Sequence, residues 1–258
     1  MVQAFIMSLY KGTGNNISFA GLYNYERMLV DSTFKKALFI YLIIQVPIML
    51  FFALVVAVML NDKKLKFKGF FRVAIFLPCV TSLVSYSLIM KAIFANHGMF
   101  NSVMTDWGIL DQPILWVTDP FWAKALIIIS ITWRWIGYNM VFYLAGLQNI
   151  EPSVYEAADI DGAGPIKKFF TITVPLLKPI ILFTTITSTI GTLQLFDEVQ
   201  NITQGGPANG TVTISQYIYN LCFKFTPNFG YACAVSFVVV LLIVILSMIQ
   251  FRLARDKD

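Results

Sequence analysis

The sequence predicts an all-α polytopic membrane protein. Hydrophobic residues make up 57% of its 258 residues and charged residues only 13%, whereas soluble domains average about 25% charged residues. Five apolar stretches are long enough to cross the membrane as helices, which takes roughly 20 residues, and none alternates like a strand of a membrane barrel. These predicted spans lie near residues 37–60, 71–95, 121–146, 176–196 and 230–251. We expect the whole chain, 1–258, to form a single transmembrane domain.

The connecting segments predict the orientation of the spans. Basic residues gather in three segments, which are 61–72, 147–175 and the C-terminal tail. By contrast, 96–120 holds no Lys or Arg, and 197–229 holds only Lys224. Because basic loops stay in the cytoplasm, the three basic segments are predicted to be cytoplasmic, with the C-terminus inside.

The N-terminal segment does not fit an orientation with five spans. It would lie outside, yet it carries Lys11, Arg27, Lys35 and Lys36. Its opening, MVQAFIMSLY, is apolar but about half as long as a span requires. We therefore expect it to be the outer end of a helix that starts upstream of this chain. It lacks the basic leader and small-residue cleavage site of a signal peptide.

One loop on the outer side is long enough to hold a helix of its own. Residues 96–120 contain Trp107 and Trp116. Tryptophan side chains are enriched at the headgroup level of membranes. We therefore expect a short interfacial helix in this loop, with both tryptophans as its anchors.

Several function classes lack their residues here. The three cysteines form no CxxC pair, and His97 is the only histidine, so redox and metal sites are disfavoured. No glycine is followed by lysine, which excludes a Walker A loop. The net charge is +5, but the Lys and Arg residues lie mostly at the ends of the apolar stretches. This distribution is typical of membrane topology and argues against nucleic acid as a partner. We predict a chain that is not an enzyme.

The segment 152–175 is predicted to form two short, rigid helices in the cytoplasm. Pro152 suits the first position of a helix, and Gly162 supplies a left-handed stop. Pro165 opens a second helix, which we expect to end before Val174 and Pro175 because proline disfavours a helical residue ahead of it.

The first of these helices has a small-residue side and an acidic edge. Ala157 and Ala158 would let another surface approach the backbone, and Glu156 and Asp159 share a face because they lie three residues apart. Such a helix suits insertion into a groove of a partner. The spacing alone equally fits an ordinary elbow that links two spans.

The same segment closely resembles the EAA loop of permease subunits of binding-protein-dependent ABC importers. That pattern is Glu-Ala-Ala, three residues, Gly, nine residues, Ile, then Leu-Pro. The matching positions are Glu156, Ala157, Ala158, Gly162, Ile172 and Pro175, with Val174 where leucine is usual. GLYNY (21–25), LAGLQNIEPSVYEAADIDGA (144–163), FDEVQNITQGGPANGT (196–211) and YIYNLCF (217–223) resemble the carbohydrate-uptake branch, the maltose and glycerol-phosphate type. The similarity runs from about residue 17 to 251.

The resemblance implies a type I permease fold in the inner membrane of a prokaryote and a set of partners. These are a second permease subunit, two ATPase subunits, an extracytoplasmic solute-binding protein, a carbohydrate substrate and membrane lipid. No cofactor is expected in this chain, since ATP and Mg would be bound by the ATPases. The residues expected to couple to the ATPase are Tyr155, Glu156, Ala157, Ala158, Asp161, Gly162, Ala163, Phe169 and Pro175.

Polar groups at membrane depth are the candidates for a substrate path, because burying them in lipid is costly. They are Trp133, Arg134, Tyr138 and Asn139 in the third span, and Gln194 and Asp197 at the end of the fourth. Aromatic faces and amides suit the C–H patches and hydroxyls of a sugar. Pairing of Arg134 with a partner permease and ordinary packing of the aromatics stay open.

An ion-driven secondary carrier is the alternative function. Carriers of that class use intramembrane acids and paired broken helices. No Asp or Glu lies near the centre of any predicted span, which favours the importer.

Overall fold

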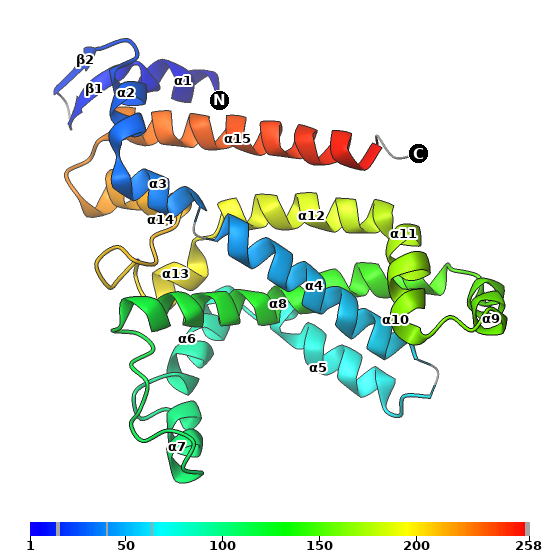
Figure 1. Ribbon diagram of the computed structural model, residues 1–258. Coiled ribbons are helices and arrows are strands. Elements are labelled where there is room, and N and C mark those ends of the chain that lie inside the picture. Colours follow the sequence, from blue (N-terminus) through cyan, green and yellow to red (C-terminus); the bar gives the residue numbers. More distant parts are fainter. Residues whose placement is uncertain (14–15, 40, 63, 256–258) are drawn as a thin grey trace. The chain divides into compact units, whose positions relative to one another are not determined.

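The computed structural model describes residues 1–258 except 14–15, 40, 63 and 256–258. The chain is mainly helical, as predicted (Figure 1). In chain order the described elements are α1 (Val2–Ser8), β1 (Tyr10–Thr13), β2 (Asn16–Phe19), α2 (Tyr23–Val30), α3 (Ser32–Phe39), α4 (Leu42–Asn61), α5 (Lys68–Val80), α6 (Leu83–Ile93), α7 (Met99–Asp106), α8 (Pro120–Gln148), α9 (Pro152–Ile160), α10 (Pro165–Lys168), the π-helix η1 (Phe169–Thr173), α11 (Val174–Leu176), α12 (Lys178–Leu193), α13 (Asp197–Ile202), α14 (Ile214–Tyr219), the π-helix η2 (Asn220–Lys224) and α15 (Phe229–Arg255).

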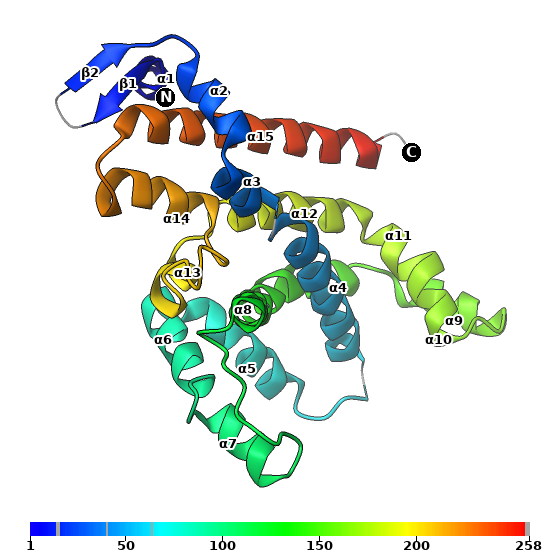
Figure 2. The ribbon, with the colours of Figure 1, turned by 60° about the vertical axis from the view of Figure 1, so that its left-hand side comes forward.

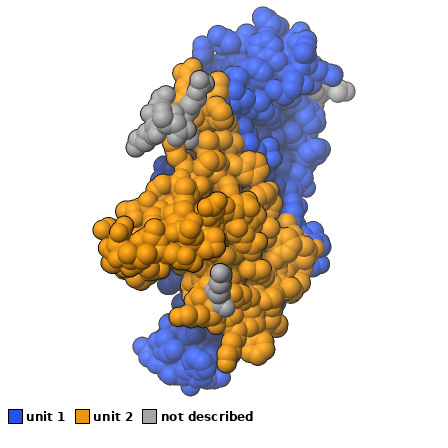
Figure 3. Space-filling view, turned by 90° about the vertical axis from the view of Figure 1, so that its right-hand side faces the viewer, with its two compact units in different colours: residues 1–45, 82–131, 189–246 blue, residues 46–81, 132–188, 247–258 orange. Residues whose placement is uncertain are grey.

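The chain divides into two compact units, which Figure 3 shows in different colours. Unit 1 comprises residues 1–45, 82–131 and 189–246. Unit 2 comprises residues 46–81, 132–188 and 247–258. The predicted coupling segment belongs wholly to unit 2. The single domain expected from the sequence stays a prediction.

Among the described residues, three helical stretches are long and apolar enough to span a membrane, and they cover three of the predicted spans. They are Ser32–Asn61, Pro120–Gln148 and Phe229–Leu253. Two bent helix pairs, α5 with α6 and the helix Pro165–Leu176 with α12, raise the number to as many as five. The predicted fold class and number of spans agree with this arrangement.

The structure corrects the continuous helix expected over 71–95. Thr81 and Ser82 have extended backbone, with ψ of 151° and 134°, so α5 ends at Val80 and α6 begins at Leu83. The Thr81 hydroxyl donates to the carbonyl of Pro78 at 3.0 Å. A proline within a helix and a hydroxyl that bonds back to the backbone both weaken the helical ladder, which accounts for the break.

Unit 1 begins with a segment that the sequence did not predict. After α1, strands β1 and β2 pair antiparallel, with Tyr10 opposite Phe19 and Thr13 opposite Asn16 (Figure 2). Gly12 has a φ of +131°, and a Cβ there would lie 1.9 Å from the carbonyl oxygen of Asn16. Only glycine fits at this place in the hairpin.

Trp116 corrects the prediction of two interfacial anchors in the loop 96–120. The expected short helix is α7, and Trp107 at its end is 72% exposed, but Trp116 is only 4% exposed. Its ring packs against Phe94 with ring centroids 4.9 Å apart, and its indole N–H donates to Asn101 at 3.3 Å. A buried indole whose N–H is satisfied is a core residue of unit 1.

The core of unit 2 joins α4, α8 and α12 to the coupling segment. Ala57, Tyr143 and Leu177 are buried in one apolar cluster, against which Phe169 and Val174 pack. Helices α8 and α12 come close at Gly146, where a Cβ would lie 2.2 Å from the Cδ1 of Ile180. Small residues permit such approach between membrane helices.

Candidate coupling loop and membrane path

The first helix of the coupling segment forms as its sequence predicts. Glu151 is the extended residue ahead of α9, and Pro152 occupies the first turn. At the other end Gly162 has a φ of +71°. The N–H of Gly162 donates to the carbonyl of Asp159 at 3.1 Å, and that of Ala163 to Ala158 at 2.9 Å. These two bonds close a Schellman motif, which fixes the end of the helix.

The second helix runs further than predicted. It starts at Pro165, continues as the π-helix η1 and ends as α11 at Leu176, so the expected end before Val174 and Pro175 is wrong. In a π-helix the hydrogen bonds run from residue i to i−5, and the turn is wider. This wider turn directly ahead of Pro175 relieves the clash that a proline ring makes in an α-helix.

Side-chain bonds tie the two helices together, and they lie side by side at one end of unit 2 (Figures 1 and 2). Lys168 Nζ lies 2.6 Å from Asp159 Oδ1. The hydroxyls of Tyr155 and Thr173 are hydrogen-bonded at 3.0 Å. Because the ion pair is solvent-exposed, it contributes at most about 1 kcal/mol. Rigidity therefore depends more on the apolar anchoring of Phe169 and Val174 to the core.

The outward surface of the loop is apolar at its tip and acidic along one edge. Ile160 is 88% exposed and Ile166 is 76% exposed. These two side chains give the loop an apolar surface that the described part of the chain leaves uncovered. Six of the predicted coupling residues lie on the exposed side or at the rim of the loop. These six residues are Glu156, Ala157, Asp161, Gly162, Ala163 and Pro175.

The remaining predicted coupling residues face inward. Ala158 is 8% exposed, which separates it from the exposed Ala157. Tyr155 and Phe169 are half-buried, the first bonded to Thr173 and the second packed on the core. These three residues therefore hold the loop in place.

Four predicted substrate-path residues lie on two turns of α8 within unit 2. Asn139 is fully buried, and its amide donates to the Ser188 hydroxyl on α12 at 3.1 Å. Trp133 and Tyr138 are 41% and 36% exposed, and Arg134 is half-buried. The structure thus brings an aromatic, a cationic and an amide side chain to one stretch of helix.

An aromatic row on α8 was only partly anticipated. The ring centroids of Trp135 and Tyr138 are 5.3 Å apart, and those of Tyr138 and Phe142 are 5.1 Å apart. Trp135, Tyr138 and Phe142 are spaced three and four residues apart, which places their side chains on one face of the helix. This spacing is the sequence pattern that predicts the row. The ring of Phe142 in turn packs against that of Phe183 on α12, with the two ring centroids 5.3 Å apart.

Gln194 and Asp197 belong to unit 1. Gln194 is exposed just after α12, and Asp197 is the half-buried first residue of α13. The carbonyl oxygen of Asp197 accepts from the Asn201 amide at 2.7 Å. Among the residues that the structure describes, no group of three or more His, Cys, Asp or Glu could hold a metal ion.

Residues 37–257 match the family of "Binding-protein-dependent transport system inner membrane component" proteins. The lactose transport system permease protein LacF of Rhizobium radiobacter is 55% identical over 100% of this chain and 88% of its own length. The arabinooligosaccharides transport system permease protein AraP of Bacillus subtilis (strain 168) is 34% identical over 98% of this chain and 82% of its own. Both relatives are permeases for sugars, in agreement with the resemblance to the carbohydrate-uptake branch.

A solved structure has the same fold. A chain of a bacterial ABC transporter involved in the import of the acidic polysaccharide alginate superposes with a TM-score of 0.78. The match covers 92% of this chain and 84% of that one at 21% identity. The chain therefore belongs to the family of binding-protein-dependent transport system inner membrane components, and it is a non-catalytic permease subunit of an ABC importer.

Proposed function

We propose that this permease carries lactose or a closely similar disaccharide across the membrane. The observation that carries the proposal is the 55% identity to the lactose permease over the full chain, compared with 34% to the arabinooligosaccharide permease. The aromatic row on α8 supports it, since the face of an exposed ring such as that of Tyr138 suits the C–H patches of sugar rings. Trp133, Arg134 and Tyr138 would contact the sugar. The buried Asn139, bonded to Ser188, would hold α8 against α12 behind them.

The assembly would contain this chain, a second permease, two ATPases that bind ATP and Mg, and an extracytoplasmic binding protein. The loop 152–175 and the C-terminus would face the cytoplasm, as the basic segments indicate. The exposed apolar tip and the acidic edge of the loop would enter a cleft of one ATPase. When the two ATPases close on ATP, they would move the loop together with unit 2. The Schellman closure, the Tyr155–Thr173 bond and the anchoring of Phe169 supply the stiffness that this requires.

The coupling role is tested with the reconstituted importer. We expect Glu156→Lys, or a bulky residue at Gly162, to abolish the ATPase activity that the sugar-loaded binding protein stimulates, with normal insertion into the membrane. Glu151→Lys is the matched control, because it makes the same charge change on an exposed residue directly ahead of the loop. Full transport by both variants, or equal loss in the control, would contradict the proposal.

The substrate and the energy source are tested by uptake into proteoliposomes. We expect transport of lactose to exceed that of arabino-oligosaccharides and to require ATP. Uptake that continues without ATP but stops when ion gradients collapse would favour the ion-driven carrier instead.

A further inference from the structure

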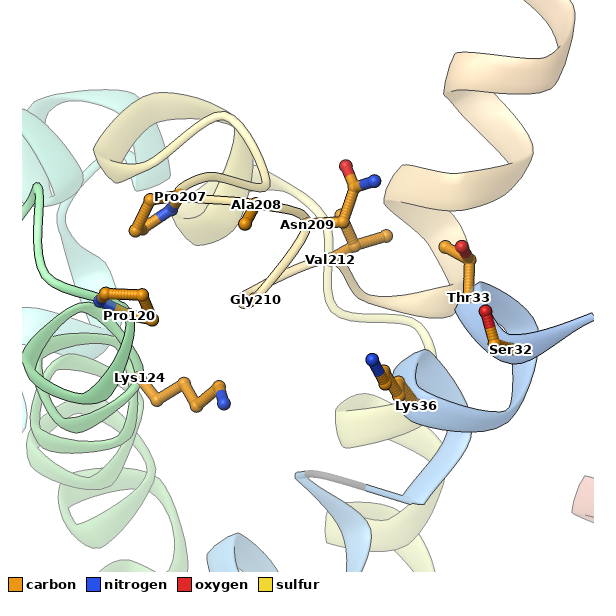
Figure 4. A pocket seen from close by; sticks show the side chains of 10 residues that line it. All are labelled: Ser32, Thr33, Lys36, Pro120, Lys124, Pro207, Ala208, Asn209, Gly210 and Val212. Carbon is orange, nitrogen blue, oxygen red and sulfur yellow. The ribbon is translucent and has the colours of Figure 1, made fainter.

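Unit 1 contains a pocket of about 460 Å³ that the proposed function does not use. It lies between the start of α3, the start of α8 and the turn at 207–210 (Figure 4). Its volume falls within the range of about 300–1,000 Å³ that is typical of ligand sites. Its polar side chains are Ser32, Thr33, Lys36, Lys124 and Asn209.

Two lysines give the pocket its charge. Figure 4 shows Lys36 of α3 and Lys124 of α8 directed into the pocket from opposite sides. The Cε of Lys124 lies 3.7 Å from the place of a Cβ on Gly210, so its stem rests against the turn. No acidic side chain is among the described residues that line the pocket. Two ammonium groups that face one space favour an anion between them.

The acids that adjoin the pocket in sequence are engaged elsewhere. Asp31 accepts from the hydroxyls of Tyr217 and Tyr231 at 2.5 and 2.7 Å. Asp119 accepts from the first backbone N–H groups of α8, at 2.9 Å from Phe121. Neither lysine has a carboxylate within ion-pair distance among the described parts of the chain. The positive charge of the pocket is therefore not neutralised by this part of the chain.

We propose that this two-lysine pocket receives an acidic side chain of the solute-binding protein when that protein docks. The inference rests on the proposed orientation, in which the turn 203–210 and the starts of α3 and α8 lie on the extracytoplasmic side, opposite the basic loops. Hydroxyl and amide donors beside the ammonium groups suit a carboxylate. The hydroxyl side chains of Ser32 and Thr33 and the turn 207–210 line the pocket together with the two lysines.

The test measures binding of the purified, lactose-loaded binding protein to the complete importer in detergent micelles without phospholipid. We expect the double variant Lys36→Gln/Lys124→Gln to raise the Kd about tenfold at low ionic strength, and the difference to shrink at high salt. The matched control is Lys35→Gln/Lys224→Gln, which removes the same charge from exposed residues of unit 1 outside the pocket. It is expected to change the Kd by less than about twofold.

Three outcomes would overturn the inference. The first is a double variant that behaves like the control. The second is a defect that appears only when phospholipid is restored, which would assign the pocket to a lipid phosphate. The third is normal docking with a selective loss of uptake of lactobionate relative to lactose, which would assign it to an anionic sugar. Failure of the unmodified importer to respond to its binding protein would instead refute the proposed function.

Discussion

The left-handed backbone at Gly162 offers a direct test of how much the stiffness of the coupling loop matters. Gly162 has a φ of +71°, whereas Gly164, two residues on, has a φ of −63°. A Cβ at either position would meet no atom within 4 Å. Alanine at 162 and alanine at 164 therefore differ in backbone strain and not in steric clash.

The expected size of the effect follows from the backbone conformation. An L-residue in the left-handed region costs about 1–2 kcal/mol relative to glycine. At 164 the loss of chain entropy in the unfolded state stabilises by about 0.4–1 kcal/mol, which roughly offsets the weaker helix cap. Gly162→Ala should thus raise the population of the state in which the two hydrogen bonds of the Schellman motif are broken by about 5–30-fold. Gly164→Ala should leave that population nearly unchanged.

Hydrogen exchange of the amides at 162 and 163 measures this opening, because both N–H groups donate within the closure. We expect Gly162→Ala to exchange them faster by that factor and to lower the ATPase stimulation by the binding protein. Equal exchange in the two variants would refute the assignment of strain to Gly162. Faster exchange with unchanged stimulation would refute the idea that a stiff loop is needed for coupling.

Two further predictions concern hydrogen bonds within the units. Burial alone would raise the pKa of Asp31, but the hydrogen bonds from Tyr217 and Tyr231 and from backbone N–H groups outweigh it, so the pKa is lowered. The charged carboxylate therefore stabilises folded unit 1 at pH values above the unfolded pKa of about 3.9, and this contribution is lost as the pH falls through the lower folded pKa. In thermal unfolding, Asp31→Asn should lower the stability of unit 1 by about 1 kcal/mol near neutral pH and by less at pH 3. In unit 2, the Tyr143 and Thr184 hydroxyls are 2.7 Å apart, so a double-mutant cycle with Tyr143→Phe and Thr184→Val should give a coupling of about 0.6 kcal/mol, and a value near zero would contradict the bond.

The coupling segment was predictable because its determinants are local. Proline fixes the start of each helix, and the glycine stop depends only on the backbone at that residue. Gly162 therefore adopts the predicted conformation in the structure. The length of the second helix was misjudged because the π turn ahead of Pro175 depends on packing of Phe169 and Val174 against a core that no local pattern reveals.

Features set by tertiary contacts were harder to predict. Trp116 is a residue type enriched at membrane interfaces, which is why the sequence predicts an anchor there. In the structure Phe94 and Asn101 form a buried site for its ring, and burying a large ring whose N–H is hydrogen-bonded is more favourable than leaving it at the interface. The break at Thr81 and Ser82 lies within a stretch whose composition fits one continuous span. Hydropathy records the cost of transfer into lipid but not the continuity of the helix.

The two connections that join the loop to its neighbouring helices differ in a way that bears on coupling. On the α8 side, Asn149 and Glu151 are exposed, and only the half-buried Ile150 between them packs against the core of unit 2. On the α12 side, the helix Pro165–Leu176 turns by 73° at Leu177, which is 1% exposed in the core of unit 2. The carbonyl of Leu177 accepts from the N–H groups of both Ile180 and Ile181, at 2.9 and 2.8 Å, which closes the bend. A buried, hydrogen-bonded bend deforms less than an exposed connection, because its backbone groups have no water to replace the lost bonds. Force applied at the tip of the loop should therefore reach the membrane mainly through the second helix and α12.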